Sequence, residues 1–181
     1  MPRNFVLLVG FAVFSSVLFA QQSLPDSLRR IYSTEKDLVK KADAYFQLAD
    51  LLVDEKPERG ALLADTLEQM GQTTRNPKIL SRVSHLRGQM YYHQGKYHLA
   101  LPFYREALNF ANKTKDPELK GRAYNAVGSC FHDMVQNDSA LVYLMKAARL
   151  KEQVGNKKDI AAAYSNIGNV FSDELARSEE R

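Results

Sequence analysis

The sequence predicts an all-α fold, a superhelical solenoid of stacked helical hairpins, and two observations carry this prediction. The stretch Ala-Tyr-Asn-Ala-Val-Gly-Ser-Cys-Phe, which ends at Phe131, returns forty residues later as Ala-Tyr-Ser-Asn-Ile-Gly-Asn-Val-Phe, which ends at Phe171. Apolar residues recur at helical spacing along the chain, and no sustained period-2 alternation indicates strands. Repeated helical units bury their apolar faces only against neighbouring units, so they stack into a solenoid.

Length and composition favour one ordinary globular domain. The chain has 181 residues, of which 45% are apolar and 25% are charged. These fractions indicate neither a disordered chain nor a bundle of membrane helices.

Residues 1–20 have the pattern of a secretory signal peptide and are set apart from the fold. Arg3 supplies an early positive charge, an unbroken run of apolar and small residues follows from Phe5 to Phe19, and Ala20 precedes the polar Gln21. The alternative is a retained anchor, but a helix of about 16 residues spans only about 24 Å of a hydrocarbon core of about 30 Å. We therefore expect a periplasmic or secreted protein with no stable membrane insertion after cleavage.

Charge and cysteine content narrow the possible partners and chemistry. The 25 basic and 21 acidic residues give a net charge of +4, and they are interspersed along the helices. Nucleic-acid binding needs a clustered basic face, so we expect none. The single cysteine, Cys130, excludes an internal disulfide framework and is expected to be a small residue packed between helices.

The first predicted repeat copy covers about residues 35–75, behind a capping segment at residues 21–34. Its first helix is expected to begin after the cap residues Ser33 to Asp37 and to end near Val53. Pro57 is suited to the first position of the partner helix. The residues expected to face inward are Tyr45, Leu48, Ala49 and Leu52 on the first helix and Gly60, Ala64 and Leu67 on the second.

The second and third copies, residues 76–115 and 116–155, have the clearest pattern. Asn76-Pro77 and Asp116-Pro117 predict the start of the first helix in each copy, and Gly95 lies in the predicted turn to the partner helix. Loops are expected at residues 113–117 and 155–158. The matching inward positions are Gly88, Tyr91, Ala100, Tyr104 and Ala107 in the second copy, and Gly128, Phe131, Ala140, Leu144 and Ala147 in the third.

A partial fourth copy covers residues 156–181. Tyr164, Ile167, Gly168 and Phe171 repeat the inward stripe of a first helix, whereas residues 172–181 are polar and predict no partner helix. Two interpretations remain open. The helix is a solvating cap of the array, or the reading frame is truncated within a longer array.

These residues resemble the tetratricopeptide repeat. The segment Tyr124-x-x-Val127-Gly128-x-x-Phe131, followed by Ala140-x-x-x-Leu144, is similar to the signature of that family, with Tyr in place of the usual Trp. The resemblance covers essentially the whole chain after residue 20. The period of about forty residues, a signal peptide and an Asp26-Ser-Leu opening are similar to the extracytoplasmic sensor regions of bacterial histidine kinases and helix-turn-helix regulators.

The resemblance implies a concave face that binds a protein or peptide. In such arrays the first helix of each pair lines the concave face, and residues one turn from the packing stripe point into it. Their amide, hydroxyl and guanidinium groups suit a peptide backbone or acidic side chains, and Tyr92 offers a stacking surface. The alternative is a merely hydrated inner surface. The candidate residues are Arg82, His85, Gln89, Tyr92, His93, Arg122, Asn125, Ser129, His132, Asp133, Ser165, Asn169 and Ser172.

No motif predicts catalysis, a cofactor or a metal site. The sequence has no Gly-rich phosphate loop, G-x-S-x-G, H-E-x-x-H or C-x-x-C. His85 and His93 are about 12 Å apart along one helix, too far to share an ion. We expect a non-catalytic binding scaffold, either the interaction part of a signalling protein or a self-contained scaffold for envelope complexes. A hydrolase that uses His93 or His132 with Asp133 is the remote alternative.

Overall fold

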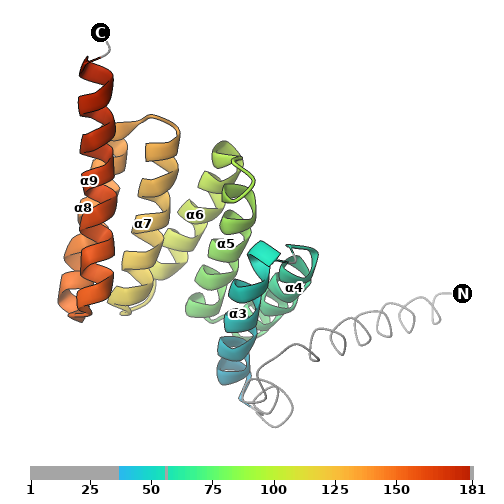
Figure 1. Ribbon diagram of the computed structural model, residues 1–181. Helices are drawn as coiled ribbons and strands as arrows, with labels where there is room; N and C mark the ends of the chain where they lie inside the picture. The colour runs from blue at the N-terminus through green and yellow to red at the C-terminus, as the bar shows by residue number, and fades with distance from the viewer. Residues whose placement is uncertain (1–36, 56, 180–181) are drawn as a thin grey trace, which may run out of the picture.

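The protein is described by a computed structural model over residues 37–55 and 57–179, and this part of the chain contains seven helices and no strand. The predicted signal peptide at residues 1–20 and the capping segment at residues 21–34 lie outside the described residues. The helices are α3 (Leu38–Glu55), α4 (Pro57–Thr74), α5 (Pro77–Tyr92), α6 (Tyr97–Asn112), α7 (Pro117–Asp133), α8 (Asn137–Val154) and α9 (Lys157–Glu179) (Figure 1).

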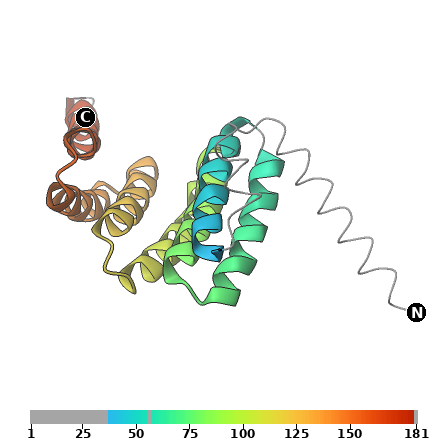
Figure 2. The ribbon, with the colours of Figure 1, turned by 90° about the horizontal axis from the view of Figure 1, so that it is seen from below.

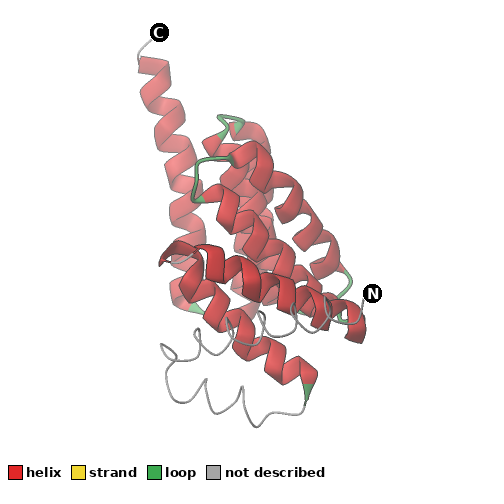
Figure 3. Ribbon diagram, turned by 90° about the vertical axis from the view of Figure 1, so that its right-hand side faces the viewer, coloured by secondary structure: helices red, strands yellow, loops and turns green. Residues whose placement is uncertain are grey.

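The helices form hairpins that stack side by side, as the forty-residue period predicts. Helices α3 and α4, α5 and α6, and α7 and α8 pair, while each second helix also packs against the first helix of the next pair. Contacts from α3 to α5, from α5 to α7 and from α7 to α9 place these four first helices in one layer. Figure 2 shows the succession of pairs from α3 to α9, and Figure 3 shows the short connections between helices. The predicted all-α, tetratricopeptide-like solenoid is confirmed.

Helix starts follow the capping residues of the sequence. The Asn76 side chain accepts hydrogen bonds from the backbone N–H groups of Lys78 and Ile79, and Asp116 accepts one from Leu119. These bonds satisfy donors that a helix N-terminus otherwise leaves unpaired. The predicted starts at Pro77 and Pro117 are therefore confirmed.

The connection before α9 is shorter than the predicted loop at residues 155–158. Gly155 adopts a left-handed conformation with φ of 82° and ends α8. The Asn156 side chain then accepts a hydrogen bond from the N–H of Lys158, and α9 begins at Lys157. Gly155 caps the end of α8 and Asn156 caps the start of α9, so these two residues form the whole connection.

The repeat glycines admit large side chains from the partner helices. A Cβ atom on Gly88 would lie 2.5 Å from the Tyr104 ring, and one on Gly128 would lie 2.7 Å from Cγ of Leu144. Tyr104 and Leu144 are 3% and 1% exposed. The close helix approach predicted at both glycines is confirmed, and Cys130 is fully buried beside it.

Helix α9 departs from the earlier copies in length and in exposure. It continues through the polar residues from Ser172 to Glu179, so most of the predicted polar tail belongs to the same helix. Tyr164 and Phe171 are 52% and 55% exposed, although their counterparts in α7 contact Tyr143 of α8. No second helix covers this stripe within the described residues. In the same part of the chain, we find no helix with the length and apolar character needed to cross a bilayer.

Candidate functional site

The inner face, which we define as the surface formed by α3, α5, α7 and α9, carries most of the candidate residues, and several of them tie one helix to the next. Arg82 of α5 forms an ion pair with Asp43 of α3. Asn125 of α7 accepts a 2.9 Å hydrogen bond from the amide of Asn166 in α9. These partners lie about one repeat apart, so Arg82 and Asn125 hold adjacent first helices together.

His132 forms another such tie, with Asp173 of α9. The distance between its Nε2 atom and the Asp173 carboxylate is 2.9 Å. The remote hydrolase hypothesis assigned His132 to Asp133 of its own helix. The observed pairing gives this imidazole a partner on the neighbouring helix instead.

Two arginines lie close together over α3. The guanidinium groups of Arg82 and Arg122 lie 4.9 Å and 5.9 Å from the centre of the Phe46 ring. Arg122 is exposed, and among the described residues its guanidinium contacts the carboxylate of Glu118 at 3.5 Å. An exposed pair of this kind is worth at most about 1 kcal/mol, so the Arg122 guanidinium can readily exchange it for another anion.

Three buried polar atoms on the inner face have no hydrogen-bond partner among the described residues. They are Nδ1 of His85, Oε1 of Gln89 and Oδ2 of Asp133. His85 and Gln89 are one turn apart on α5, and Asp133 lies near the end of α7. Such an atom costs about 1–3 kcal/mol when it is left unpaired, so each is a position where a ligand gains by supplying a partner.

The environment keeps the imidazole of His85 uncharged. Burial, and then the positive charge of Arg122, lower the pKa of His85 from 6.5 to about 3. The ring also packs on Tyr104 with centroids 5.2 Å apart. A neutral histidine here can donate or accept one hydrogen bond without a buried charge.

Tyr92 is less available than the predicted stacking role requires. Its ring contacts those of Tyr97 and Tyr104, with centroids 5.3 Å and 6.2 Å apart. Burial, and then hydrogen bonding with Asp133, raise the pKa of Tyr92 above its usual range. The half-buried Tyr92 therefore keeps only part of its ring for a ligand.

A cavity of about 190 Å³ opens where the inner face meets the turn between α8 and α9. It brings together three predicted residues, His85, Arg122 and Asn125. The other lining residues were not predicted: two lie at the end of α8, a second helix, and three lie on α7 and α9 at positions that the repeat pattern did not assign to the inner face. The residues missed are Glu118, Ala126, Lys151, Val154 and Asp159.

The remaining candidates do not line this cavity. Gln89, Tyr92 and Asp133 lie further along α5 and α7, and Arg82 lines an adjacent narrow crevice that also contains His85 and Arg122. Ser129 and His132 are half-buried, and the other four are exposed. The candidates exposed on the surface are His93, Ser165, Asn169 and Ser172.

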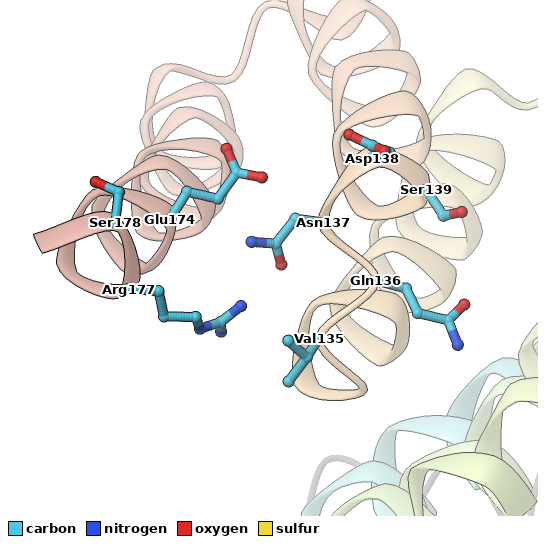
Figure 4. Close-up of a pocket in the computed structure, with 8 residues that line it drawn as sticks. All are labelled: Val135, Gln136, Asn137, Asp138, Ser139, Glu174, Arg177 and Ser178. Atoms are coloured by element: carbon cyan, nitrogen blue, oxygen red, sulfur yellow. The ribbon is translucent and has the colours of Figure 1, made fainter. Parts of the chain in front are cut away.

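A second, wider groove of about 670 Å³ lies between the start of α8 and the end of α9 (Figure 4). Figure 4 shows Glu174 and Arg177 on α9 opposite Asn137 and Val135 at the turn into α8. None of the candidate residues lies there. Its width reflects the last turns of α9, which stand beyond the body of the solenoid (Figure 1).

Two features of the described residues bear on catalysis, the Cys130 thiol and the placement of the metal-ligating side chains. Burial, and then the charge of Asp133, raise the pKa of Cys130 to about 12, so its thiol is not ionised at neutral pH. No group of three or more histidine, cysteine or carboxylate side chains is placed to hold a metal ion in the part of the chain that the structure describes. The inner face offers hydrogen bonds and charge.

The comparisons with known proteins agree with this architecture. Residues 79–153, from α5 to the end of α8, match the tetratricopeptide repeat family. Proteins with this repeat generally serve as protein-interaction scaffolds and are typically non-catalytic. No protein of curated function matches the chain.

Solved structures show the same fold. Among 24 matching chains is the crystal structure of BtubC (BKLC) from P. vanneervenii, which is 17% identical with a TM-score of 0.57. The match covers 81% of this chain, and this chain spans 62% of the length of that one. At this identity the likeness concerns the fold alone.

Proposed function

We propose that the chain is a non-catalytic scaffold that binds a peptide segment of another protein on the inner face of α5 and α7. The observation that carries this proposal is the row of unpartnered buried polar atoms on His85, Gln89 and Asp133, next to the cavity at Arg122. The structural core does not use these atoms. A bound chain that pairs them removes a cost already present in the free protein.

The chemistry of the row favours a peptide backbone. The amide oxygen of Gln89 and the carboxylate of Asp133 accept hydrogen bonds, and backbone N–H groups are the donors that every peptide offers at regular spacing. Arg122 and Lys151 both line the cavity and provide positive charge for an acidic side chain. The ligand that we propose is therefore a peptide with an Asp or Glu that enters the cavity.

The cationic groups of the cavity set orientation more than affinity. Glu118 and Asp159 also line the cavity, so its net charge is balanced. A ligand carboxylate must displace Glu118 from Arg122, and charge pairs of this kind chiefly fix register and partner choice. Affinity then comes mainly from the hydrogen bonds of the buried row.

Selection from a displayed library of random peptides tests the proposal. The wild-type chain should enrich peptides with a shared acidic position, and Arg122→Glu should weaken their binding at least tenfold. Arg149→Glu is the matched control because Arg149 is an exposed arginine on α8 that lines neither the cavity nor the crevice. Equal binding by wild type and Arg122→Glu, or equal losses in both variants, would contradict the proposed site.

We further propose that the scaffold works outside the cytoplasm as the interaction part of a signalling protein. The charged start and apolar run of residues 1–20 support export, and the period, signal pattern and Asp26 opening support the sensor resemblance. Fractionation of a bacterial host, followed by mass spectrometry of the intact chain, tests export. Cytoplasmic protein that retains residues 1–20 would refute it.

A further inference from the structure

The outer face of α9 carries an apolar seam, which we define as Tyr164, Gly168, Phe171 and Leu175. The three large side chains are 52%, 55% and 62% exposed. A Cβ atom on Gly168 would meet nothing within 4 Å. The Tyr164 hydroxyl donates a 2.6 Å hydrogen bond to Glu152 of α8, which holds the ring at the edge of the seam.

The equivalent positions in the two preceding repeats are covered. Gly88 receives the Tyr104 ring and Gly128 receives Leu144, each close enough to exclude a Cβ atom. Gly168 stands forty residues after Gly128 in the same sequence pattern. Its empty surface therefore has the shape that elsewhere in this molecule accepts one large apolar side chain from a helix.

The spacing of the seam is that of a helix-pairing surface. Its members are separated by four, three and four residues, the a and d spacing of a coiled coil. Exposed apolar residues at this spacing on a 23-residue helix form a stripe long enough for several layers of side chains. The occupant that matches this stripe is another helix.

We propose that the occupant is α9 of a second copy of this chain, packed antiparallel. Gly168 and Leu175 occupy a positions, and Tyr164 and Phe171 occupy d positions. When antiparallel helices pair a with d, Phe171 of each copy lies over Gly168 of the other. Tyr164 of each copy then lies opposite Leu175 of the other. The large ring over the glycine repeats the packing of Tyr104 on Gly88. Two further layers, of Tyr164 and Leu175, extend the contact on both sides.

The charges at the ends of α9 agree with the antiparallel direction. Lys158, in the first turn, and Glu179, at the last helical residue, are both exposed and flank the seam. Antiparallel pairing places each Lys158 beside the Glu179 of the second copy, whereas parallel pairing places like charges together. Opposite charges at such flanking positions set the orientation of paired helices.

The length of α9 gives the second copy access. Helices α5 and α7 have 16 and 17 residues, so α9 is longer by about two turns. These turns project beyond the hairpins in Figure 1, and the wide groove of Figure 4 separates them from the start of α8. The proposed peptide site uses residues of α5 and α7, whereas the seam lies on α9, so the two proposals rest on different residues.

Analytical ultracentrifugation of the exported chain over a series of concentrations tests the proposal. Mass spectrometry first establishes where the N-terminus of that chain lies. Wild type should show twice the mass of a monomer, and Phe171→Glu and Gly168→Leu should each return it to the monomer. The glycine variant should keep its helical content because the site is open in the single chain. Asn169→Leu is the matched control, since Asn169 is an exposed neighbour outside the seam.

Disulfide trapping tests the register. The double variant Tyr164→Cys with Leu175→Cys should form covalent dimers on oxidation, whereas Leu175→Cys alone should not. Within one helix these positions are about 16 Å apart, too far for an internal bridge. A monomeric wild type over the whole concentration series, or a dimer that survives Gly168→Leu, overturns the proposal. Efficient cross-linking through Leu175→Cys alone also overturns it.

Discussion

Gly128 and Gly168 stand at the same position of successive repeats but have opposite surroundings. A methyl group on Gly128 would lie 2.7 Å from Cγ of Leu144 and 3.1 Å from its backbone nitrogen, which a small side-chain rotation cannot relieve. We expect Gly128→Ala to lower the free energy of unfolding by about 1–3 kcal/mol, as overpacked cores do. Gly168→Ala should instead raise it by about 0.5–1 kcal/mol, because alanine lowers the entropy lost on helix formation.

Urea denaturation of both variants in dilute protein measures the difference. The two substitutions are chemically identical, so the sign of the effect depends only on the partner helix. A higher midpoint for Gly128→Ala would contradict the packing of Leu144 on Gly128, and a lower midpoint for Gly168→Ala would contradict the open site at Gly168.

His85 provides a pH-dependent contribution to stability. Its pKa is about 3 in the folded chain against 6.5 for an ordinary histidine, so the unfolded chain binds more protons between these values. Stability therefore falls as pH decreases through this window. From pH 7 to pH 5, the contribution of His85 should fall by about 1–2 kcal/mol.

The variant His85→Gln keeps a polar group but removes this titration. Denaturation of both proteins at pH 7 and pH 5 should show a smaller loss in the variant, because all other titrating groups are shared. Parallel losses would indicate that water reaches the imidazole and that its pKa is not depressed.

At the scale of elements, the turns within the second and third hairpins use different residues at one position. Gly95 and Val135 are forty residues apart, and both adopt positive φ, 70° and 62°. A β-branched residue is strained in this region by about 1–2 kcal/mol. Val135 is 60% exposed, so its side chain gives little packing in return.

We expect Val135→Gly to raise the free energy of unfolding by about 0.5–1 kcal/mol, the strain removed less the added entropy of the unfolded chain. Gly95→Val should lower it by a similar amount, since nothing lies within 4 Å of a side chain there and only the backbone is affected. Thermal melts of the two reciprocal variants measure this. Destabilisation by Val135→Gly would mean that the turn does not hold the valine at positive φ.

The element boundaries that the sequence predicted well are those with local signals. Asn76-Pro77 and Asp116-Pro117 combine a side-chain acceptor with a proline, which has no N–H that needs an acceptor, so each start is specified within a few residues. The end of α9 has no such signal. After Phe171 only Leu175 continues the apolar stripe, and the helix extends to Glu179 mainly through local propensity, which leaves no periodic signal in the sequence.

The candidate site was predictable only in part for a related reason. The repeat phase identified His85, Arg122 and Asn125 because it fixes which side of each first helix faces inward. Lys151 and Asp159 reach the cavity because α8 ends beside α7, and this depends on packing between hairpins. Oε1 of Gln89 and Oδ2 of Asp133 have no hydrogen-bond partner because of how the neighbouring helices pack. The apolar pattern of a single helix does not specify this packing.

At the scale of the whole molecule, the core divides along the solenoid. One cluster of buried residues joins α3, α4 and α5, and a second joins α6, α7, α8 and α9. Among the described residues the main helix contacts join neighbouring hairpins, so stability should be a sum of local terms. The two ends can then open separately.

Cavity-forming substitutions in the two clusters should separate these units. Leu67→Ala in the first cluster and Leu144→Ala in the second remove matched side chains that are each 1% exposed. Each should cost about 2–5 kcal/mol. Because coupling runs only between neighbours, Leu67→Ala should speed amide hydrogen exchange mainly in α3 and α4 and leave α8 protected. Leu144→Ala should do the reverse, and equal acceleration of all helices in both variants would show that the array unfolds as one cooperative unit.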